Sequence, residues 1–260
     1  MNIWTQMSVD YANQRNYLDE LYKVYPIIPE GIREVDNALW RTVESSFLKK
    51  DNGALIESLL DLELFPIKDS YVAYFKRDRG ALKRNPETVN RLAGRIYEMG
   101  LTEIFKKCTE PKETNRQIGP LFRRWLNKKT LGVSLLSSEK FLLSSENAVL
   151  DAGDAEMRLF AEKYLGYSHP KGLDFVARFN GKYIIGEAKF LTDFGGHQNA
   201  QFQDAIQTLE AKDVTAVKIA ILDGVLYIKS GNKMYDFIAT NKQKYNIMSS
   251  LVLRDFLYQV

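Results

Sequence analysis

The sequence predicts an α/β fold, with a mixed central β-sheet flanked by helices and a mainly helical subdomain before it. In the first half of the chain, apolar residues recur near helical spacing, whereas from residue 173 the pattern changes to short strand-like runs. One helical stretch lies before these runs and another between the second and third, an order typical of a mixed sheet with helices on its faces. We therefore divide the chain into a helical subdomain, 1–135, and a sheet-containing core, 136–260.

The first half contains several segments with the periodicity of amphipathic helices. They cover residues 32–48, 54–64, 86–107 and 119–128. The run YVAYF at 71–75 is apolar but too short to be assigned to a helix or a strand. Residues 130–150 are rich in leucine and serine and are expected to connect the two halves. A further helix is expected at 154–165, with Asp151 or Asp154 as its N-terminal cap.

Strand-like runs dominate the second half. They are DFVARF at 174–179, KYIIGEAKF at 182–190, VKIAILDG at 217–224 and VLYIKS at 225–230, with a helix expected at 200–211. These segments supply the predicted sheet and one of its covering helices.

The composition is that of a globular protein, and it excludes some kinds of site. Hydrophobic residues make up 45% of the 260, and the net charge of +3 permits a polyanionic partner without requiring one. With Cys108 as the single cysteine and two histidines, neither a disulfide within the chain nor a zinc cluster is expected. No signal peptide is recognisable and no apolar run reaches the ~18 residues that span a membrane, so we expect a cytoplasmic protein without membrane contact.

The dipeptide Asn180-Gly181 lies between two strand-like runs and predicts a tight hairpin. Both residues tolerate the positive φ angles of a type I′ turn. With these two residues as the loop, Phe179 pairs with Lys182, and this pair sets the register of the whole hairpin.

The predicted register brings three ionisable side chains together. Asp174 lies opposite Glu187, so both carboxylates point to one face with their Cβ atoms ~5 Å apart. Lys189 is two residues beyond Glu187 and returns to the same face. Two carboxylates across a pair of strands repel each other unless a cation lies between them.

Two interpretations of this cluster are open. In the first, the carboxylates bind Mg²⁺, a hard cation that prefers oxygen ligands, and the metal assists hydrolysis of a phosphodiester. Lys189 then orients or deprotonates the attacking water. In the second, the three side chains form a structural ion-pair network. The apolar residues 183–186 favour the first, because a charged residue that ends a buried strand is unusual.

The motifs around the cluster resemble the signature of the PD-(D/E)XK nuclease superfamily. They are Lys171-Gly172-Leu173-Asp174 and Ile185-Gly186-Glu187-Ala188-Lys189, and the resemblance extends over roughly residues 150–230, where the order of elements also agrees. It implies a restriction-endonuclease-like core in which Asp174 and Glu187 bind the metal together with the carbonyl of Ala188, and Lys189 is the catalytic lysine. Glu156 stands where some members have an additional helix glutamate. The sequence departs from the pattern at Leu173, which replaces a proline.

Within that superfamily the chain is most similar to a type II restriction endonuclease. It has no P-loop and no QxxxY pattern of RecB-like exonucleases, and its helical half is longer than junction resolvases usually have. The resemblance implies Mg²⁺-dependent, sequence-specific cleavage of double-stranded DNA that leaves 5′-phosphates. We expect a homodimer, whose symmetry matches a palindromic site, and a cognate DNA methyltransferase in the same system but not as a stable partner. Two alternatives stay open: a DNA repair or structure-selective nuclease of the same fold, and a non-catalytic DNA-binding module.

Three groups of side chains are candidates for DNA contacts. Two basic stretches supply Lys76, Arg77, Arg79, Lys83, Arg84, Arg123 and Arg124, and the segment after a Gly-Gly turn supplies His197, Gln198, Asn199, Gln201 and Gln203. Basic side chains bind phosphates, and the amides of Asn and Gln make paired hydrogen bonds to adenine. A solvated face or a helix cap is the alternative interpretation of each group.

Overall fold

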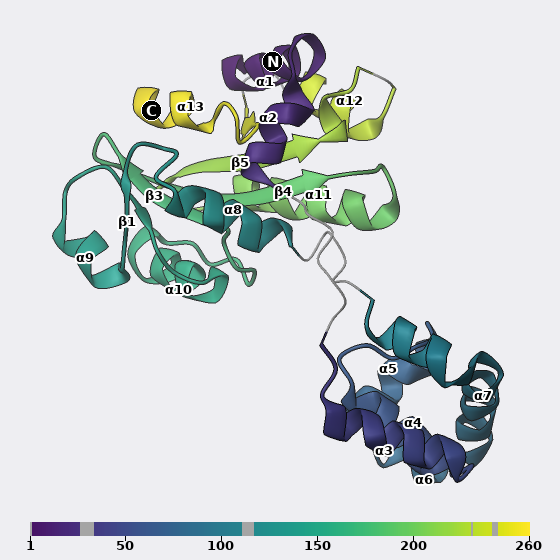
Figure 1. The fold of residues 1–260 in the computed structure, drawn as a ribbon. Helices are drawn as coiled ribbons and strands as arrows, with labels where there is room; N and C mark the ends of the chain where they lie inside the picture. The colour runs from purple at the N-terminus through teal and green to yellow at the C-terminus, as the bar shows by residue number, and fades with distance from the viewer. Residues whose placement is uncertain (1, 27–33, 111–116, 230, 241–243) are drawn as a thin grey trace. The chain divides into compact units, whose positions relative to one another are not determined.

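The computed structural model describes residues 2–26, 34–110, 117–229, 231–240 and 244–260. The chain forms two compact units (Figure 1): residues 1–27 with 114–260, which we call the sheet unit, and residues 28–113, which we call the helical unit. The fold is α/β, as predicted, with a helical N-terminal region followed by a mixed sheet interleaved with helices. Among the described residues, no helix is long and apolar enough to cross a membrane.

Helices account for the regular structure of the described part of the helical unit. They are α3 (Asn37–Leu48), α4 (Asn52–Asp61), α5 (Ser70–Arg77), α6 (Ala81–Arg84) and α7 (Pro86–Cys108). Asp36, Asp51 and Asp69 cap the first three by accepting hydrogen bonds from backbone N–H groups of the first turn. Helix α7 kinks at Gly100, whose φ of 75° is not helical. The unit has its own apolar core, to which the buried Cys108 contributes as a packing residue.

The sheet unit contains a six-stranded mixed sheet whose strands lie in chain order. They are β1 (Ser134–Leu136), β2 (Ala148–Leu150), β3 (Phe175–Phe179), β4 (Lys182–Leu191), β5 (Val217–Gly224) and β6 (Asn246–Met248). Strand β3 is antiparallel to both β2 and β4, while the remaining neighbours are parallel. Strands β4 and β5 form the longest ladder, and β3 and β4 are the two middle strands of the sheet.

Helices cover the sheet of this unit (Figure 1). They are α1 (Ile3–Gln14), α2 (Tyr17–Val24), α8 (Ile118–Asn127), α9 (Ser138–Leu143), α10 (Asp154–Leu165), α11 (Gly196–Glu210), α12 (Lys233–Thr240) and α13 (Leu253–Gln259). Side chains alternate between the faces of a strand, and Val176 and Ile185 pack in one core with α9 and α10. Phe175 and Ile184 pack in another core with α2 and α8. Glu187 continues the alternation of Ile185 and so lies on the α10 face.

The structure confirms most of the predicted elements and corrects several. The predicted strand at 225–230 is wrong in its described part: residues 225–227 form a 3₁₀ helix, because Gly224 turns the chain with a φ of 103°. Residue 230 lies outside the described residues. The expected connection at 130–150 instead contains β1, α9 and β2. Neither aspartate proposed as the cap of α10 serves, since the N-cap is Gly153 and makes no side-chain capping bond.

The predicted division after residue 135 does not coincide with the two units. Residues of α1, α2 and α8 share one apolar core with the sheet, so these helices belong to the sheet unit. Their apolar side chains are buried in this shared core, which a linear division of the chain cannot anticipate. Of the predicted helix at 32–48, residues 32–33 lie outside the described residues.

Candidate active site

The hairpin of β3 and β4 has the predicted turn and register. Asn180 and Gly181 have φ angles of 51° and 75°, and Phe179 pairs with Lys182. The ladder continues to the pair of Phe175 and Gly186 and stops just before the candidate site. The hairpin therefore places Asp174 and Glu187 at its open end.

Asp174, Glu187 and Lys189 lie together at that end of the hairpin. The ammonium of Lys189 is 2.5 Å from Oδ2 of Asp174 and 2.6 Å from Oε2 of Glu187. Oδ2 of Asp174 also accepts a hydrogen bond of 2.9 Å from the backbone N–H of Ala188. The cation that two neighbouring carboxylates require is thus supplied by the lysine.

The surroundings hold Asp174 in place from both sides. Its backbone N–H donates to the carbonyl of Gly186 across the hairpin, over 3.1 Å. The preceding residue, Leu173, donates in the same way to the carbonyl of Asp154 at the start of α10. Gly172 lies so close to this turn of α10 that a Cβ atom would be 2.9 Å from the Cβ of Asp154. The segment before Asp174 therefore packs tightly on α10.

Burial and the closeness of the three charges shift the pKa values of Glu187 and Lys189. The Glu187 side chain is only 6% exposed, and this burial, together with the charge of Asp174, raises its pKa to about 8. Burial alone would lower the pKa of Lys189, but the charges of Asp174 and Glu187 outweigh it and raise that pKa. Lys189 is therefore an ammonium at neutral pH, which does not favour the expected role of a base toward water.

The donor set of the site fits a Mg²⁺ ion. Mg²⁺ binds carboxylate oxygens and keeps several of its waters, so one or two carboxylates suffice. A buried glutamate whose pKa is raised by a second acid is stabilised by any nearby cation. In the described part of the chain, no cluster gathers three or more His, Cys, Asp or Glu side chains. The protein ligands available are thus the two carboxylates and neighbouring backbone carbonyls.

Glu156, the expected additional glutamate, does not join the pair of acids. It is exposed on the first turn of α10 and accepts a hydrogen bond of 3.1 Å from Ser138. The described contacts of its carboxylate are therefore with α9.

The basic residues expected to contact DNA differ in their contacts within the protein. Arg79 and Arg84 pair with Asp61 and Asp78 within the helical unit, and Arg123 pairs with Asp154 of α10. Lys76 donates to the carbonyl of Glu63 over 3.4 Å. The remaining members, Arg77, Lys83 and Arg124, are exposed.

Some polar side chains of the segment after β4 form hydrogen bonds within that segment. Gln198 is buried, and its amide bonds the backbone N–H and the hydroxyl of Thr192. The Asn199 amide donates to the carbonyl of Phe194. His197 and Gln203 are exposed, and Gln201 is half-buried with its amide 3.2 Å from the His197 ring.

A second buried acid lies beside β4 and was not predicted from the sequence. Asp223 pairs with Phe190 in the β4–β5 ladder and accepts hydrogen bonds from Tyr17, Tyr25 and Ser249. Its burial raises its pKa. The ring of Tyr25 stacks on that of Phe190 at 5.2 Å, next to Lys189. The signal available in the sequence was an aspartate at the end of the apolar run VKIAILDG.

Comparison with known proteins identifies the family. The family model described as Tsp45I type II restriction enzyme matches residues 2–260. Neither the curated proteins nor the solved structures gave a match to this chain. Because the family model spans nearly the whole chain, including both units, the chain belongs to the Tsp45I type II restriction enzyme family and is a site-specific DNA endonuclease.

Proposed function

We propose that Asp174, Glu187 and Lys189 form the active site of this restriction enzyme, and that the enzyme is a Mg²⁺-dependent member of the PD-(D/E)XK superfamily. The observation that carries the proposal is the ammonium of Lys189 within hydrogen-bonding distance of both carboxylates at the open end of the hairpin. The reaction is hydrolysis of both strands of double-stranded DNA at a specific sequence, leaving 5′-phosphates and 3′-hydroxyls.

Each side chain has a role that follows from its charge. Asp174 and Glu187 would hold Mg²⁺ through their carboxylate oxygens, with the carbonyl of Ala188 as a third donor. A metal held there would supply polarisation of the scissile phosphodiester and stabilisation of charge on its oxygens. Lys189 carries a positive charge and three N–H donors, so it orients the attacking water and stabilises the negative charge that develops on the phosphate. Glu156 is assigned no part beyond its contact with Ser138.

DNA binding is assigned to exposed side chains of both units. Arg77, Lys83 and Arg124 are the members of the basic groups best available for phosphates, and His197 and Gln203 are the exposed polar side chains after the catalytic strand. Residues 34–110 contain as many acidic as basic residues. Phosphate binding by the helical unit therefore depends on local clusters rather than on its net charge.

The enzyme is proposed to act as a homodimer. One active site per chain cuts one strand, so two copies related by a two-fold axis cut both strands of a palindromic site. A DNA methyltransferase of the same specificity is expected to protect the host DNA without binding this chain stably.

Cleavage of a long, fully sequenced, unmethylated DNA tests the proposal. We expect discrete fragments in the presence of Mg²⁺, none with EDTA, and none with Lys189→Ala. The control is Lys171→Ala, which removes an exposed lysine that pairs with Asp204 outside the site.

Other outcomes identify the alternatives. Full cleavage by Lys189→Ala would reject the proposed active site. Cleavage restricted to branched or damaged DNA would point to a structure-selective nuclease. Binding without cleavage, over a range of metals and methylation states, would point to a non-catalytic module.

A further inference from the structure

The ends of β4 and β5 extend beyond the neighbouring strands of the sheet. Strand β3 pairs with β4 only as far as Gly186, and β6 pairs with β5 only as far as Ile221. In the described part of the chain, residues 189–191 and 222–224 therefore have no strand partners except each other. We call this two-stranded segment the β4–β5 end.

Lys189 is the first residue that β4 contributes to the β4–β5 end. Two strands without further neighbours are marginally stable in water and need packing against another element. The ammonium of Lys189 must nevertheless stay within hydrogen-bonding distance of Asp174 and Glu187. The side chains that pack on this segment therefore determine how firmly the proposed catalytic lysine is held.

Tyr25 contacts both strands of the β4–β5 end. Its ring stacks on that of Phe190 in β4, with 5.2 Å between the ring centres and 9° between the ring planes. Its hydroxyl donates a hydrogen bond of 2.9 Å to Oδ2 of Asp223 in β5. Phe190 and Asp223 are partners in the ladder, so Tyr25 bridges one pair of facing residues directly after Lys189.

Tyr25 is itself held by elements outside the two strands. It is buried, and its backbone N–H donates to the carbonyl of Leu21 at the end of α2. Its ring also stacks on that of Phe122 in α8, with 6.5 Å between the centres. The buried carboxylate of Asp223 accepts a further hydrogen bond of 2.5 Å from the hydroxyl of Ser249. The bridge is therefore anchored at both of its ends.

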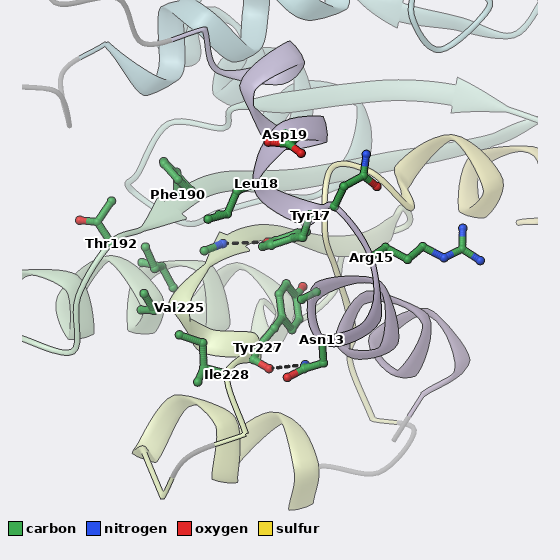
Figure 2. Close-up of a pocket in the computed structure, with 14 residues that line it drawn as sticks. Asn13, Arg15, Tyr17, Leu18, Asp19, Phe190, Thr192, Val225, Tyr227 and Ile228 are labelled. Carbon is green, nitrogen blue, oxygen red and sulfur yellow. Dashed lines mark hydrogen bonds between the residues drawn. The ribbon is translucent and has the colours of Figure 1, made fainter.

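Phe190 is less firmly enclosed than Tyr25. It is half-buried and lines a cavity of about 610 Å³, around which Figure 2 also shows Leu18, Val225 and Ile228. Because one side of Phe190 is open to this cavity, its position depends strongly on the ring of Tyr25 that stacks on it.

We propose that Tyr25 is a positioning residue for cleavage, which holds Phe190 and thereby keeps Lys189 within reach of Asp174 and Glu187. Consecutive residues of a strand point to opposite faces, so Tyr25 acts from the face of β4 opposite to the site, through the backbone at 189–190. This inference rests on the proposed active site and adds to it a residue far from Lys189 in the sequence.

Single-turnover cleavage by the full chain at saturating enzyme, with DNA affinity measured separately, tests the proposal. Tyr25→Leu removes the ring and the hydroxyl, and we expect the rate to fall about 10- to 100-fold, as a small displacement of a catalytic group does. The DNA affinity should change less than about twofold, because the loss falls on the reaction step. Tyr25→Phe keeps the ring on Phe190 and should retain a rate within about threefold of the wild type.

The matched control is Phe256→Leu on α13. Phe256 is another buried aromatic residue of the same core, and it packs edge-on against Trp4. Both leucine variants should unfold at a lower urea concentration than the wild type, but Phe256→Leu should cleave within about twofold of the wild-type rate. A merely structural role of Tyr25 predicts the same small change of rate in both variants.

A double variant tests whether Tyr25 acts through Phe190. Phe190→Leu alone should lower the rate about tenfold, and its half-buried position keeps the test available if Tyr25→Leu does not fold. Adding Tyr25→Leu to Phe190→Leu should lower the rate by less than a further threefold or so, because both substitutions remove the same contact. Losses that multiply in the double variant would overturn the proposed route.

Lys189→Ala in the same assay separates this inference from the proposed active site. If Lys189→Ala is inactive while Tyr25→Leu cleaves as fast as Phe256→Leu, the inference is overturned and the active site stands. If Tyr25→Leu loses DNA affinity but keeps its single-turnover rate, Tyr25 serves DNA binding and the inference is likewise overturned. If Lys189→Ala cleaves at the wild-type rate, the proposed active site fails and the inference fails with it.

Discussion

Glu187 makes the stability of the folded protein depend on pH, because its folded-state pKa of about 8 lies far above its ordinary value of 4.5. Between these values the folded protein holds a proton that the unfolded chain has released, so the metal-free protein loses stability as the pH rises from about 5 to 8. The slope contributed by this one group is at most about 1.4 kcal/mol per pH unit.

Thermal unfolding across pH 5–8, with and without Mg²⁺, measures this effect. We expect the melting temperature without metal to fall with pH, and the stabilisation by Mg²⁺ to increase with pH because the metal displaces the proton. Glu187→Gln should flatten both trends. Identical pH profiles for the wild type and Glu187→Gln would show that Glu187 does not titrate in this range.

Asp223 is the acceptor for several buried donors, so its removal should cost more than that of a surface acid. Asp223→Ala leaves the hydroxyls of Tyr17, Tyr25 and Ser249 without their partner. Buried polar groups without partners each cost about 1–3 kcal/mol, and we expect the free energy of unfolding to fall by roughly 3–5 kcal/mol.

Urea unfolding of Asp223→Ala measures this loss in the free energy of unfolding. Asp223→Asn keeps one acceptor oxygen and the side-chain volume, so it should cost less. A loss below about 0.5 kcal/mol for the alanine variant would contradict the role assigned to the network.

Gly186 lets strands β4 and β5 approach each other closely. A Cβ atom there would lie 2.7 Å from the backbone oxygen of Ile219 on β5, so Gly186→Ala forces β4 and β5 apart next to Glu187. We expect a loss of about 1–3 kcal/mol in stability and a fall in cleavage rate.

Gly181→Ala is the matched control for this substitution. The position has a φ of 75° but nothing within 4 Å of an added Cβ, so the cost is backbone strain of about 1–2 kcal/mol without a change in cleavage rate. Measuring unfolding and cleavage for both variants distinguishes strain in the turn from displacement of the site. Equal cleavage rates in both would contradict the importance given to the close approach of β4 and β5.

Elements with strong local patterns were predictable, and those that depend on distant contacts were not. The Asn180-Gly181 turn set the register, from which the proximity of Asp174, Glu187 and Lys189 followed. Strands β1 and β2 are three residues each, too short to show alternation. The apolar residues after Gly224 resemble a strand, but a glycine with positive φ ends the strand there. The ion pairs of Arg79, Arg84 and Arg123 also depend on tertiary contacts invisible in a run of basic residues.

At the scale of the whole molecule, the helical unit is expected to fold by itself. It has a separate apolar core that includes Leu55, Ile56 and Leu92, and its helices carry their own aspartate caps. We expect the fragment 34–110 to be helical and to unfold cooperatively, with a stability of at most about 3–5 kcal/mol, which a single core of this size rarely exceeds.

Circular dichroism of the fragment during urea unfolding measures its helical content, its cooperativity and its stability. The same fragment with Leu92→Ala, which opens a cavity in the core, should lose about 2–5 kcal/mol and hence most of its structure. A fragment 34–110 without helical signal, or without a cooperative transition, would show that the unit needs the rest of the chain.

Asp174, Glu187 and Lys189 are proposed to carry out the cleavage. The most direct measurement is the single-turnover cleavage rate of Asp174→Asn with saturating enzyme and Mg²⁺, together with DNA affinity measured separately. Asp204→Asn is the control, since Asp204 pairs with Lys171 outside the site. We expect the rate of Asp174→Asn to fall by about a thousandfold or more, because the loss of a metal ligand costs several kcal/mol of transition-state stabilisation, while the DNA affinity changes little. Cleavage by Asp174→Asn at a rate close to that of the wild type would contradict the claim.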